Sequence, residues 1–204
     1  MSLTTYSGLI AEIWADLDKD SVTNLAESWI AAVESRMNAE LRVRQMIQRD
    51  TATISSGFSA VPGDFLAPRQ MRLNASPYTQ LKYITQEQMA DFKAADPTGT
   101  MAYYAMVGGE FEFGPAPTSG VVVVLTYYQQ VPPLTTVATS NWMLAQYPLA
   151  YKTGALVEAG RYYRDAELIN LNEGMFQSVL ESIRLNSRQS DGFYMSPTPS
   201  AFAV

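Results

Sequence analysis

Residues 141–185 carry the clearest periodic pattern in the chain, and this pattern predicts two consecutive helices. Pro148 has the fixed φ and the missing N–H that the first turn of a helix tolerates. Asp165 suits the N-cap of the second helix, in which apolar side chains recur at three- and four-residue steps. The rest of the chain must therefore supply elements that cover the apolar faces of these helices.

Two glycines, Gly154 and Gly160, lie inside the first of these helices. A glycine within a helix costs roughly 1 kcal/mol relative to alanine, so two of them predict that a second backbone approaches closely. We expect the helical core to bury five side chains together: Trp14, Trp29, Leu41, Tyr151 and Leu156.

The N-terminal part of the chain also has a helical period. Residues 5–17 are expected to form a first helix with one apolar face, and Ser21 is expected to cap a longer helix that reaches about Met46. The period changes to two from Arg49 onward, which indicates strands.

Turn and cap signals divide the region that follows. Thr85 with Gln88 predicts a capping box at the start of a short helix. The pair Gly108-Gly109 predicts a tight hairpin between two strands. Together these patterns predict an α+β fold. Residues 1–47 and 141–188 form a helical bundle, residues 48–140 form an inserted, mostly antiparallel β domain with one short helix, and residues 189–204 form an extended C-terminal tail.

The composition excludes several kinds of chemistry. The 204 residues include no cysteine and no histidine, which excludes disulfides, cysteine nucleophiles, Ser-His-Asp triads and the commonest metal ligand. No glycine-rich phosphate-binding motif occurs, so we expect neither an enzyme nor a cofactor. The net charge of −6 argues against a monomer that wraps DNA phosphates. No apolar run is long enough to span a bilayer, and the N-terminus lacks the basic region of a secretory signal. No membrane partner is therefore expected.

The sharpest local motif lies between the two N-terminal helices. Side-chain oxygens stand at the spacing of an EF-hand calcium loop: Asp16, Asp18, Asp20, Asn24 and Glu27. Ser21 replaces the glycine of the sharp turn, and Thr23 replaces an apolar residue. The other interpretation is one helix end followed by one helix N-cap, with no metal site, and we adopt it. A calcium-binding helix-loop-helix module is the alternative function.

A basic cluster marks the far end of the second helix and consists of Arg36, Arg42, Arg44 and Arg49. These side chains are candidate contacts for nucleic acid or another partner, and a solvated or salt-bridged face is the alternative. Pairs of carboxylates could act as in glycoside hydrolases, but no spacing singles out a pair. A carboxylate-dependent hydrolase is therefore the weaker alternative, and no catalytic residue is assigned.

An ordered series of short motifs covers about residues 5–185. They are YSGLI at 6–10 with Trp14, ESRMN at 34–38, LRVRQM at 41–46, VPGDFL at 61–66, Arg72-Leu73 before Ser76-Pro77, FEFGPAP at 111–117, LTYY at 125–128, VPPL at 131–134, Asn141-Trp142, Tyr147-Pro148 and GAL at 154–156. The series resembles the head-to-tail adaptor proteins of tailed bacteriophages, which sit beneath the portal.

This resemblance implies a structural virion protein without enzymatic activity. The family's members form rings, usually of twelve copies, that extend the portal channel and receive the tail. The implied partners are further copies of the chain, the portal protein, a tail or nozzle protein, and DNA that passes without sequence-specific binding. The implied location is the head–tail neck of the virion, and the host cytoplasm during assembly. A net charge of −6 fits a DNA conduit whose walls do not hold DNA.

Residues 189–204 are too short and too rich in serine and proline to fold alone. We expect this tail to bind the portal or a neighbouring subunit, with docking on its own subunit as the alternative. The anchoring residues are expected to be Phe193, Tyr194, Met195, Pro197, Pro199 and Phe202.

Overall fold

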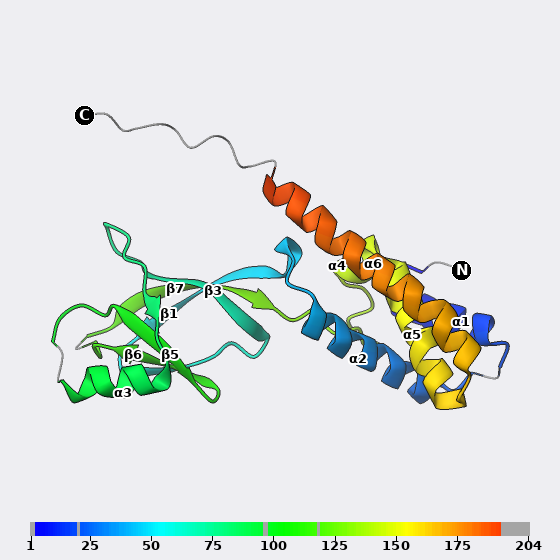
Figure 1. The fold of residues 1–204 in the computed structure, drawn as a ribbon, viewed down its shortest axis with the longest axis horizontal. Helices are drawn as coiled ribbons and strands as arrows, with labels where there is room; N and C mark the ends of the chain where they lie inside the picture. The colour runs from blue at the N-terminus through cyan, green and yellow to red at the C-terminus, as the bar shows by residue number, and fades with distance from the viewer. Residues whose placement is uncertain (1–2, 20, 96–97, 118, 193–204) are drawn as a thin grey trace. The chain divides into compact units, whose positions relative to one another are not determined.

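The computed structural model describes residues 3–19, 21–95, 98–117 and 119–192 (Figure 1). The chain divides into two compact units. The helical unit comprises residues 1–45 and 131–204, and the β unit comprises residues 46–130. Helices at both ends of the sequence and antiparallel sheets between them confirm the predicted α+β fold. Residues 193–204 lie outside the described part, and with them all six predicted anchors of the tail.

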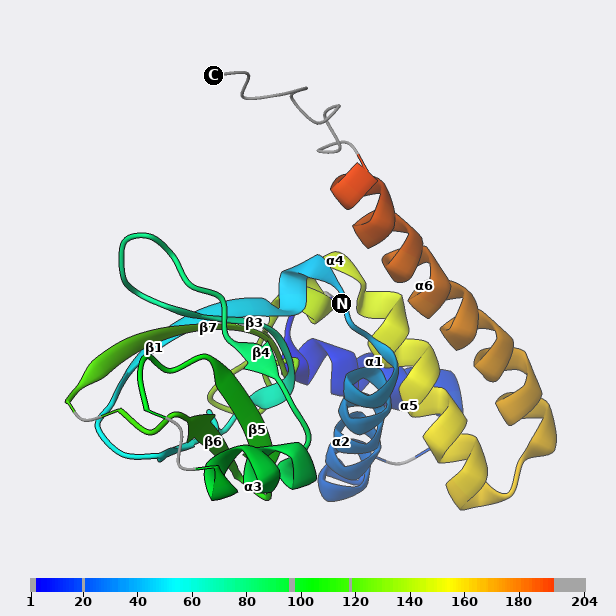
Figure 2. The same cartoon turned by 60° about the vertical axis from the view of Figure 1, so that its left-hand side comes forward.

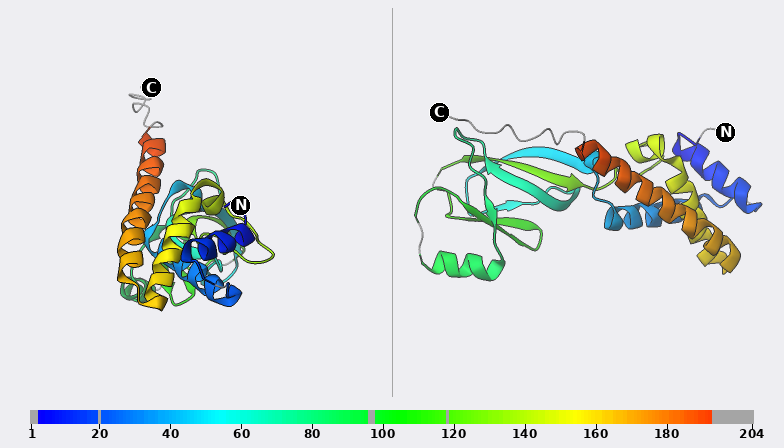
Figure 3. Two further views of the ribbon diagram at one scale, coloured as in Figure 1. Left: turned by 90° about the vertical axis from the view of Figure 1, so that its right-hand side faces the viewer. Right: turned by 45° about the horizontal axis from the view of Figure 1, so that its top comes forward.

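The helical unit is built around one central helix. Its helices are α1 (Tyr6–Leu17), α2 (Thr23–Glu40), α4 (Trp142–Gln146), α5 (Pro148–Tyr163) and α6 (Ala166–Gly192). Helix α5 contacts the four others, and α6 runs along its length (Figure 3). The five side chains predicted to form the core are all buried, and the rings of Trp14 and Trp29 lie 5.4 Å apart.

Both glycines of α5 have the predicted packing reason. A Cβ atom on Gly154 would lie 2.8 Å from Val33 Cγ2 of α2. A Cβ atom on Gly160 would lie 2.8 Å from Ile169 Cγ1 and 3.2 Å from the backbone of the turn that leads into α6. The small residues of α5 therefore allow α2 and α6 to approach it closely.

The predicted cap of α6 is confirmed, while the predicted cap of α2 is wrong. Asp165 Oδ1 accepts a hydrogen bond from the N–H of Leu168 at 3.0 Å. The N-cap of α2 is Val22, which makes no side-chain cap bond, so Ser21 does not cap this helix. The connection between α1 and α2 is thus one residue longer than the predicted cap at Ser21 implies.

Two helix ends and one additional helix differ from the sequence prediction. Helix α2 ends at Glu40, not near Met46, because Leu41 and Val43 are both buried and an alternating pattern requires extended backbone. Helix α5 begins at Pro148 as predicted, but a short helix that was not predicted, α4, precedes it; the two are separate because the residue before Pro148 is disfavoured in helical conformation. Helix α6 continues to Gly192, so residues 189–192 are helical where we expected an extended tail.

The β unit contains two sheets and one helix. After a 3-10 turn (Arg44–Met46), its elements are β1 (Ile47–Ile54), β2 (Phe58–Ala60), β3 (Phe65–Leu73), β4 (Lys82–Tyr83), α3 (Gln86–Ala94), β5 (Tyr103–Val107), β6 (Glu110–Gly114) and β7 (Val121–Gln129). One sheet has the order β1-β7-β3 and the other β2-β6-β5-β4. All neighbouring strands are antiparallel except β4 and β5.

Local signals position the elements of the β unit as predicted. Thr85 and Gln88 form the capping box at the start of α3. Gly108, with a φ of +62°, lies in the hairpin turn between β5 and β6. Helix α3 packs against these two strands (Figure 2). The core between the sheets is rich in aromatic and methionine side chains, including Phe111, Phe113 and Met71.

Candidate interaction surfaces

Arg36 is held inside the helical unit rather than presented to a partner. Its Nη2 donates a hydrogen bond to Glu173 Oε1 at 2.6 Å, and its Nη1 lies 3.5 Å from Glu158 Oε1. The guanidinium lies over the ring of Phe176, 4.6 Å from its centroid. The hydrogen bond from Arg36 holds the pKa of the Glu173 carboxyl below its usual value. Arg36 thus joins α2, α5 and α6 by charge.

The other three arginines of the predicted basic cluster do not share this position. Arg42 Nη1 donates to the carbonyl oxygen of Asn38 at 2.6 Å. Arg44 donates its backbone N–H to Ser187 Oγ at 3.0 Å, and its side chain is exposed. Arg49 is exposed on β1 and belongs to the β unit. Within the helical unit, Arg42 and Arg44 are the members of the cluster that stay accessible to a partner.

A buried carboxylate fixes the segment by which the chain returns to the helical unit. Glu34 Oε1 accepts hydrogen bonds from the backbone N–H of Leu134 at 2.8 Å and from the Tyr151 hydroxyl at 3.0 Å. Burial raises the pKa of the Glu34 carboxyl, although both hydrogen bonds act in the opposite direction. Burial and the Glu34 charge raise the pKa of Tyr151. Sequence patterns did not identify Glu34 because its partners lie far away in the chain.

Two asparagines complete this anchor. Asn38 Oδ1 accepts a hydrogen bond from the N–H of Val131 at 2.8 Å. Asn141 Nδ2 donates to the carbonyl oxygen of Pro132 at 2.6 Å and to the Tyr151 hydroxyl at 2.7 Å. The first residues after the β unit are therefore tied to α2 and α5 by side-chain hydrogen bonds.

The structure places most residues of the candidate calcium loop on the two helices that flank it. Asn24 and Glu27 lie in the first two turns of α2. Asp16 Oδ2 lies 2.9 Å from Lys152 Nζ of α5, so this carboxylate is already paired. Asp20 lies outside the described residues. Among the residues that the structure does describe, no group of three or more acidic side chains is arranged to hold a metal ion.

The outer face of α6 is apolar and uncovered within the described chain. We define this face, the α6 face, as Leu171, Gly174, Met175, Ser178, Ser182 and Leu185. These positions recur at steps of three and four residues and carry no charge. The side chains of Leu171, Met175 and Leu185 are 66%, 49% and 47% exposed. The opposite side of α6 buries Phe176, Leu180 and Ile183 in the core.

Gly174 distinguishes the α6 face from an ordinary solvated surface. Each glycine of α5 has a close neighbour, whereas a Cβ atom added to Gly174 would meet no described atom within 4 Å. A glycine inside a helix costs about 1 kcal/mol relative to alanine, and nothing within the helical unit offsets this cost. The α6 face therefore has the small and apolar side chains of a helix-packing surface, without a helix on it. The glycine in the middle of the helical pattern was the sequence signal for this face.

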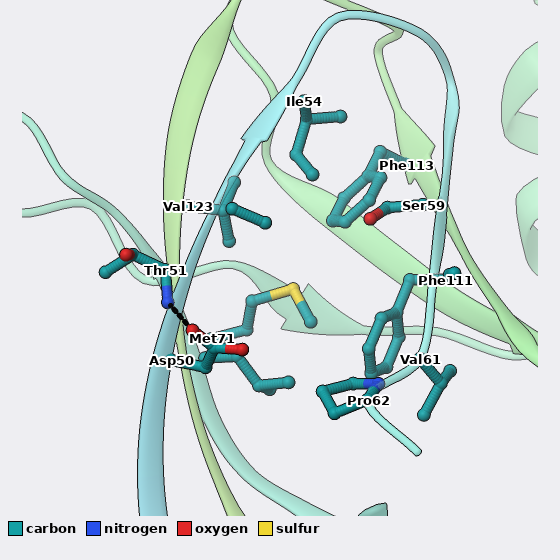
Figure 4. A pocket seen from close by; sticks show the side chains of 13 residues that line it. Asp50, Thr51, Ile54, Ser59, Val61, Pro62, Met71, Phe111, Phe113 and Val123 are labelled. Atoms are coloured by element: carbon teal, nitrogen blue, oxygen red, sulfur yellow. Dashed lines mark hydrogen bonds between the residues drawn. The ribbon is translucent and has the colours of Figure 1, made fainter.

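The β unit has an open seam between β1 and β2, which are neighbouring edge strands of different sheets. A cavity of about 160 Å3 lies in this seam. Residues 50–52 of β1 and residues 59–62 form its sides, and core side chains such as Met71, Phe111 and Val123 line its interior (Figure 4). Six consecutive residues of β1, from 48 to 53, are exposed.

The loop beside the seam is held in place. Tyr127 donates its hydroxyl hydrogen to Asp64 Oδ1 at 2.9 Å, and the N–H of Gln130 donates to the Asp64 carbonyl oxygen at 2.7 Å. Burial, together with the bond to Asp64, raises the pKa of Tyr127 to about 12. The ring of Tyr127 also stacks on Phe65 at 5.6 Å. These contacts fix the loop directly after Pro62, which is one of the residues that line the cavity.

Comparison with known families supports the broader part of the resemblance drawn from the motifs, which is that the chain is a phage adaptor protein. The family model described as SU10 adaptor protein matches residues 4–201. A search of curated proteins gives no match. Within the described residues, no helix is both long enough and apolar enough to cross a membrane. The match covers nearly the whole sequence, so the chain belongs to the SU10 adaptor protein family of phage structural adaptors, which are virion components that interact with other phage structural proteins.

Proposed function

We propose that this chain assembles into a ring beneath the portal, where it joins the phage head to the tail and extends the DNA channel. In this role it has no catalytic activity and needs no cofactor. Its partners are neighbouring copies, the portal protein, and a tail or nozzle protein. The ring has twelve copies, as in the adaptors that the sequence resembles, and its place in the virion is the head–tail neck.

The observation that carries the self-assembly is the α6 face. A ring of identical subunits needs a large surface on each copy that is covered by the next one. The α6 face offers exposed Leu171 and Met175 beside the unexplained Gly174, and these side chains resemble the inside of a helix pair. A helix of a second copy is the occupant that would give Gly174 a close neighbour.

Charge supports passage of DNA rather than its capture. The net charge is −6, and Arg36 of the predicted basic cluster is already paired with Glu158 and Glu173. A ring of such subunits carries an excess of negative charge, which repels phosphates at distances within about 8 Å at physiological ionic strength. Arg42 and Arg44 are exposed, and we assign them as contacts for a protein partner at one end of the ring.

The mass of the purified protein tests this proposal. We expect analytical ultracentrifugation or native mass spectrometry to detect multimers alone, and a defined complex when a portal ring is added. The variant with both Leu171→Glu and Met175→Glu should remain folded, because both side chains are exposed, but should sediment as a monomer. Val137→Glu is the matched control, because Val137 is 92% exposed in a loop outside the α6 face.

Each result has a clear meaning. Multimers of the control and monomers of the double variant support assembly through α6. A wild-type protein that stays monomeric both alone and with portal rings contradicts the proposed function. A double variant that assembles like the wild type would show that the ring uses another surface.

A further inference from the structure

We propose that the seam between β1 and β2 is a docking site for an extended segment, and that the segment is residues 193–204 of a second copy of this chain. The added segment pairs with the edge of β1 and places the ring of Phe202 in the cavity. The choice of a second copy rests on the proposed ring, whereas the site itself rests on the seam.

The size and lining of the cavity define the side chain that it accepts. An apolar protein cavity of about 150 Å3 stays dry and binds one benzene molecule. The seam cavity has a volume of about 160 Å3, and its interior is formed by Met71, Phe111, Phe113, Val123 and Leu125. A single phenyl ring therefore matches the volume, and a charged side chain would lose its hydration there.

The backbone of β1 provides the second half of the site. Thr51 donates its N–H to its neighbour's side chain, Asp50 Oδ1, at 2.7 Å. This N–H therefore points away from β7, and alternation along a strand directs the same groups of Arg49 and Thr53 to the open edge. A row of outward N–H and C=O groups beside an apolar pocket is the arrangement by which sheet edges recognise extended peptides.

Side chains at the rim favour an uncharged guest. Ala52 presents only a methyl group at the mouth of the cavity, so it leaves room for a ring to enter. The Asp50 carboxylate already accepts the Thr51 N–H. The residues that line the cavity include one charged side chain, that of Asp50, so they provide no pair of charges to bind a charged segment.

Residues 193–204, FYMSPTPSAFAV, have the complementary chemistry. They include no Asp, Glu, Lys or Arg. Phe202 lies between Ala201 and Ala203 in the sequence, so its ring is a large side chain with a small one on either side. The phenyl ring, unlike that of Tyr194, carries no hydroxyl that would need a partner in the cavity. Ten extended residues from 193 to 202 span about 33 Å, which allows the ring to reach a neighbouring subunit.

Site-specific crosslinking in the full-length protein tests the inference. We would introduce the photocrosslinker as Phe202→benzoylphenylalanine in protein prepared with 14N and 15N and then mixed. Irradiation should join residue 202 to peptides containing residues 50–62, and about half of the joined pairs should combine the two isotopes when subunits mix freely. Val137→benzoylphenylalanine, in an exposed loop, is the control for random collision.

Two further variants separate docking from folding. Ala52→Trp places a ring in the mouth of the cavity from the exposed edge, and Phe202→Asp replaces the proposed anchor with a charge. In Ala52→Trp protein that carries the crosslinker, the yield at residues 50–62 should fall at least tenfold while the circular dichroism spectrum is unchanged. Phe202→Asp should weaken self-association at least tenfold in sedimentation, with the same unchanged spectrum.

The outcomes also separate this inference from the proposed function. Multimers whose crosslinks lie elsewhere would overturn the seam as the docking site and leave the ring intact. Crosslinks to residues 50–62 only within single isotopes would overturn the second copy as the source. A monomer without any crosslink between chains would contradict both proposals.

Discussion

The helical unit pairs its charged groups across helices, whereas the β unit leaves an apolar seam open at the edge of its sheets. In the helical unit, Arg36 joins three helices and Lys152 pairs with Glu12 and Asp16. In the β unit, by contrast, the core reaches the surface between β1 and β2. A partner can therefore make apolar contact with the helical unit on the α6 face and with the β unit at the seam.

The difference teaches how each unit can be recognised. A helix presents side chains, because its backbone hydrogen bonds are satisfied internally, so a partner binds the α6 face through the packing of side chains. A strand edge presents backbone groups as well, so the seam can bind a segment through hydrogen bonds and one side chain. One adaptor chain thus has a surface for a rigid neighbour and a surface for an extended one.

The largest expected effect comes from the tryptophan cluster. Trp29 is buried and its ring lies 5.4 Å from that of Trp14 and 6.2 Å from that of Tyr163. Trp29→Ala should reduce the free energy of unfolding of the helical unit by about 3–5 kcal/mol. The three tryptophans, Trp14, Trp29 and Trp142, all lie in this unit, so denaturant unfolding followed by tryptophan fluorescence reports on it directly.

Hydrogen exchange can then compare the two units in the same sample. If the units are separately stable, Trp29→Ala should accelerate exchange in α5 and leave β7 protected. Phe111→Ala, which removes a buried ring from the β unit, is the matched change and should give the reverse pattern. A loss below about 1 kcal/mol for Trp29→Ala would mean that this ring contributes little to the core.

A second prediction concerns the close contact between α2 and α5. Gly154→Ala would place a methyl group 2.8 Å from Val33 Cγ2 and 3.0 Å from Phe176 Cε2. Alanine favours helix, but overpacking a core by one methyl group costs about 1–3 kcal/mol, so we expect a net destabilisation. Urea unfolding should show a lower midpoint with an unchanged slope. A stabilised Gly154→Ala variant would mean that α2 can move away from α5 at no cost.

The buried anchor of the return segment gives the third prediction. Glu34→Ala removes the acceptor of the Leu134 N–H and the Tyr151 hydroxyl, and should cost about 1–3 kcal/mol of unfolding free energy. Glu34→Gln keeps an acceptor oxygen and should cost less at neutral pH. The comparison by urea unfolding at several pH values separates the hydrogen bonds from the charge.

The sign of the pH dependence follows from the raised pKa of Glu34. A carboxyl whose folded pKa exceeds its unfolded value stabilises the fold below the unfolded pKa, and this contribution is lost as pH rises through the folded pKa. The stability of the wild type relative to Glu34→Gln should therefore decrease as the pH rises from 4.5, the ordinary pKa of a glutamate carboxyl, through the higher pKa of Glu34 in the folded state. A difference that grows with pH would mean that the carboxylate, rather than the acid, is favoured in the fold.

Local signals predicted the class of fold and several boundaries. The capping box at Thr85, the cap at Asp165 and the hairpin at Gly108 depend only on neighbouring residues, and the structure contains all three. The end of α2 was missed because the burial of Leu41 and Val43 depends on distant elements. Short-range periodicity determines which elements form, whereas tertiary contacts decide where some of them stop.

The candidate surfaces were less accessible to sequence reasoning. The pairing of Arg36 with Glu173 joins positions 137 residues apart, and no local pattern records it. The seam exists because β1 and β2 belong to different sheets, which a strand period does not show. The predicted tail anchors stay a prediction, since residues 193–204 lie outside the described part.

The smallest expected effect on stability is a stabilisation, whereas the substitutions described above destabilise. Gly174→Ala adds a methyl group where no described atom lies within 4 Å, so it should stabilise the isolated subunit by about 0.5–1 kcal/mol through helix propensity alone. The same substitution at Gly154 is expected to destabilise, so the pair compares a covered and an uncovered side of the same helical unit. Tryptophan fluorescence during urea unfolding at low protein concentration measures both.

The effect of Gly174→Ala on assembly distinguishes a packed α6 face from a solvated one. If a helix of a second copy packs on the α6 face, the methyl group at residue 174 occupies the space that this helix needs, so Gly174→Ala should raise the protein concentration required for multimers. The more stable subunit would then be the poorer assembler, an outcome that a solvated glycine cannot produce. Sedimentation over a concentration series decides between these views. A Gly174→Ala protein that is stabilised and assembles at the wild-type concentration would show that the α6 face stays in water, and the contact between subunits would have to lie elsewhere.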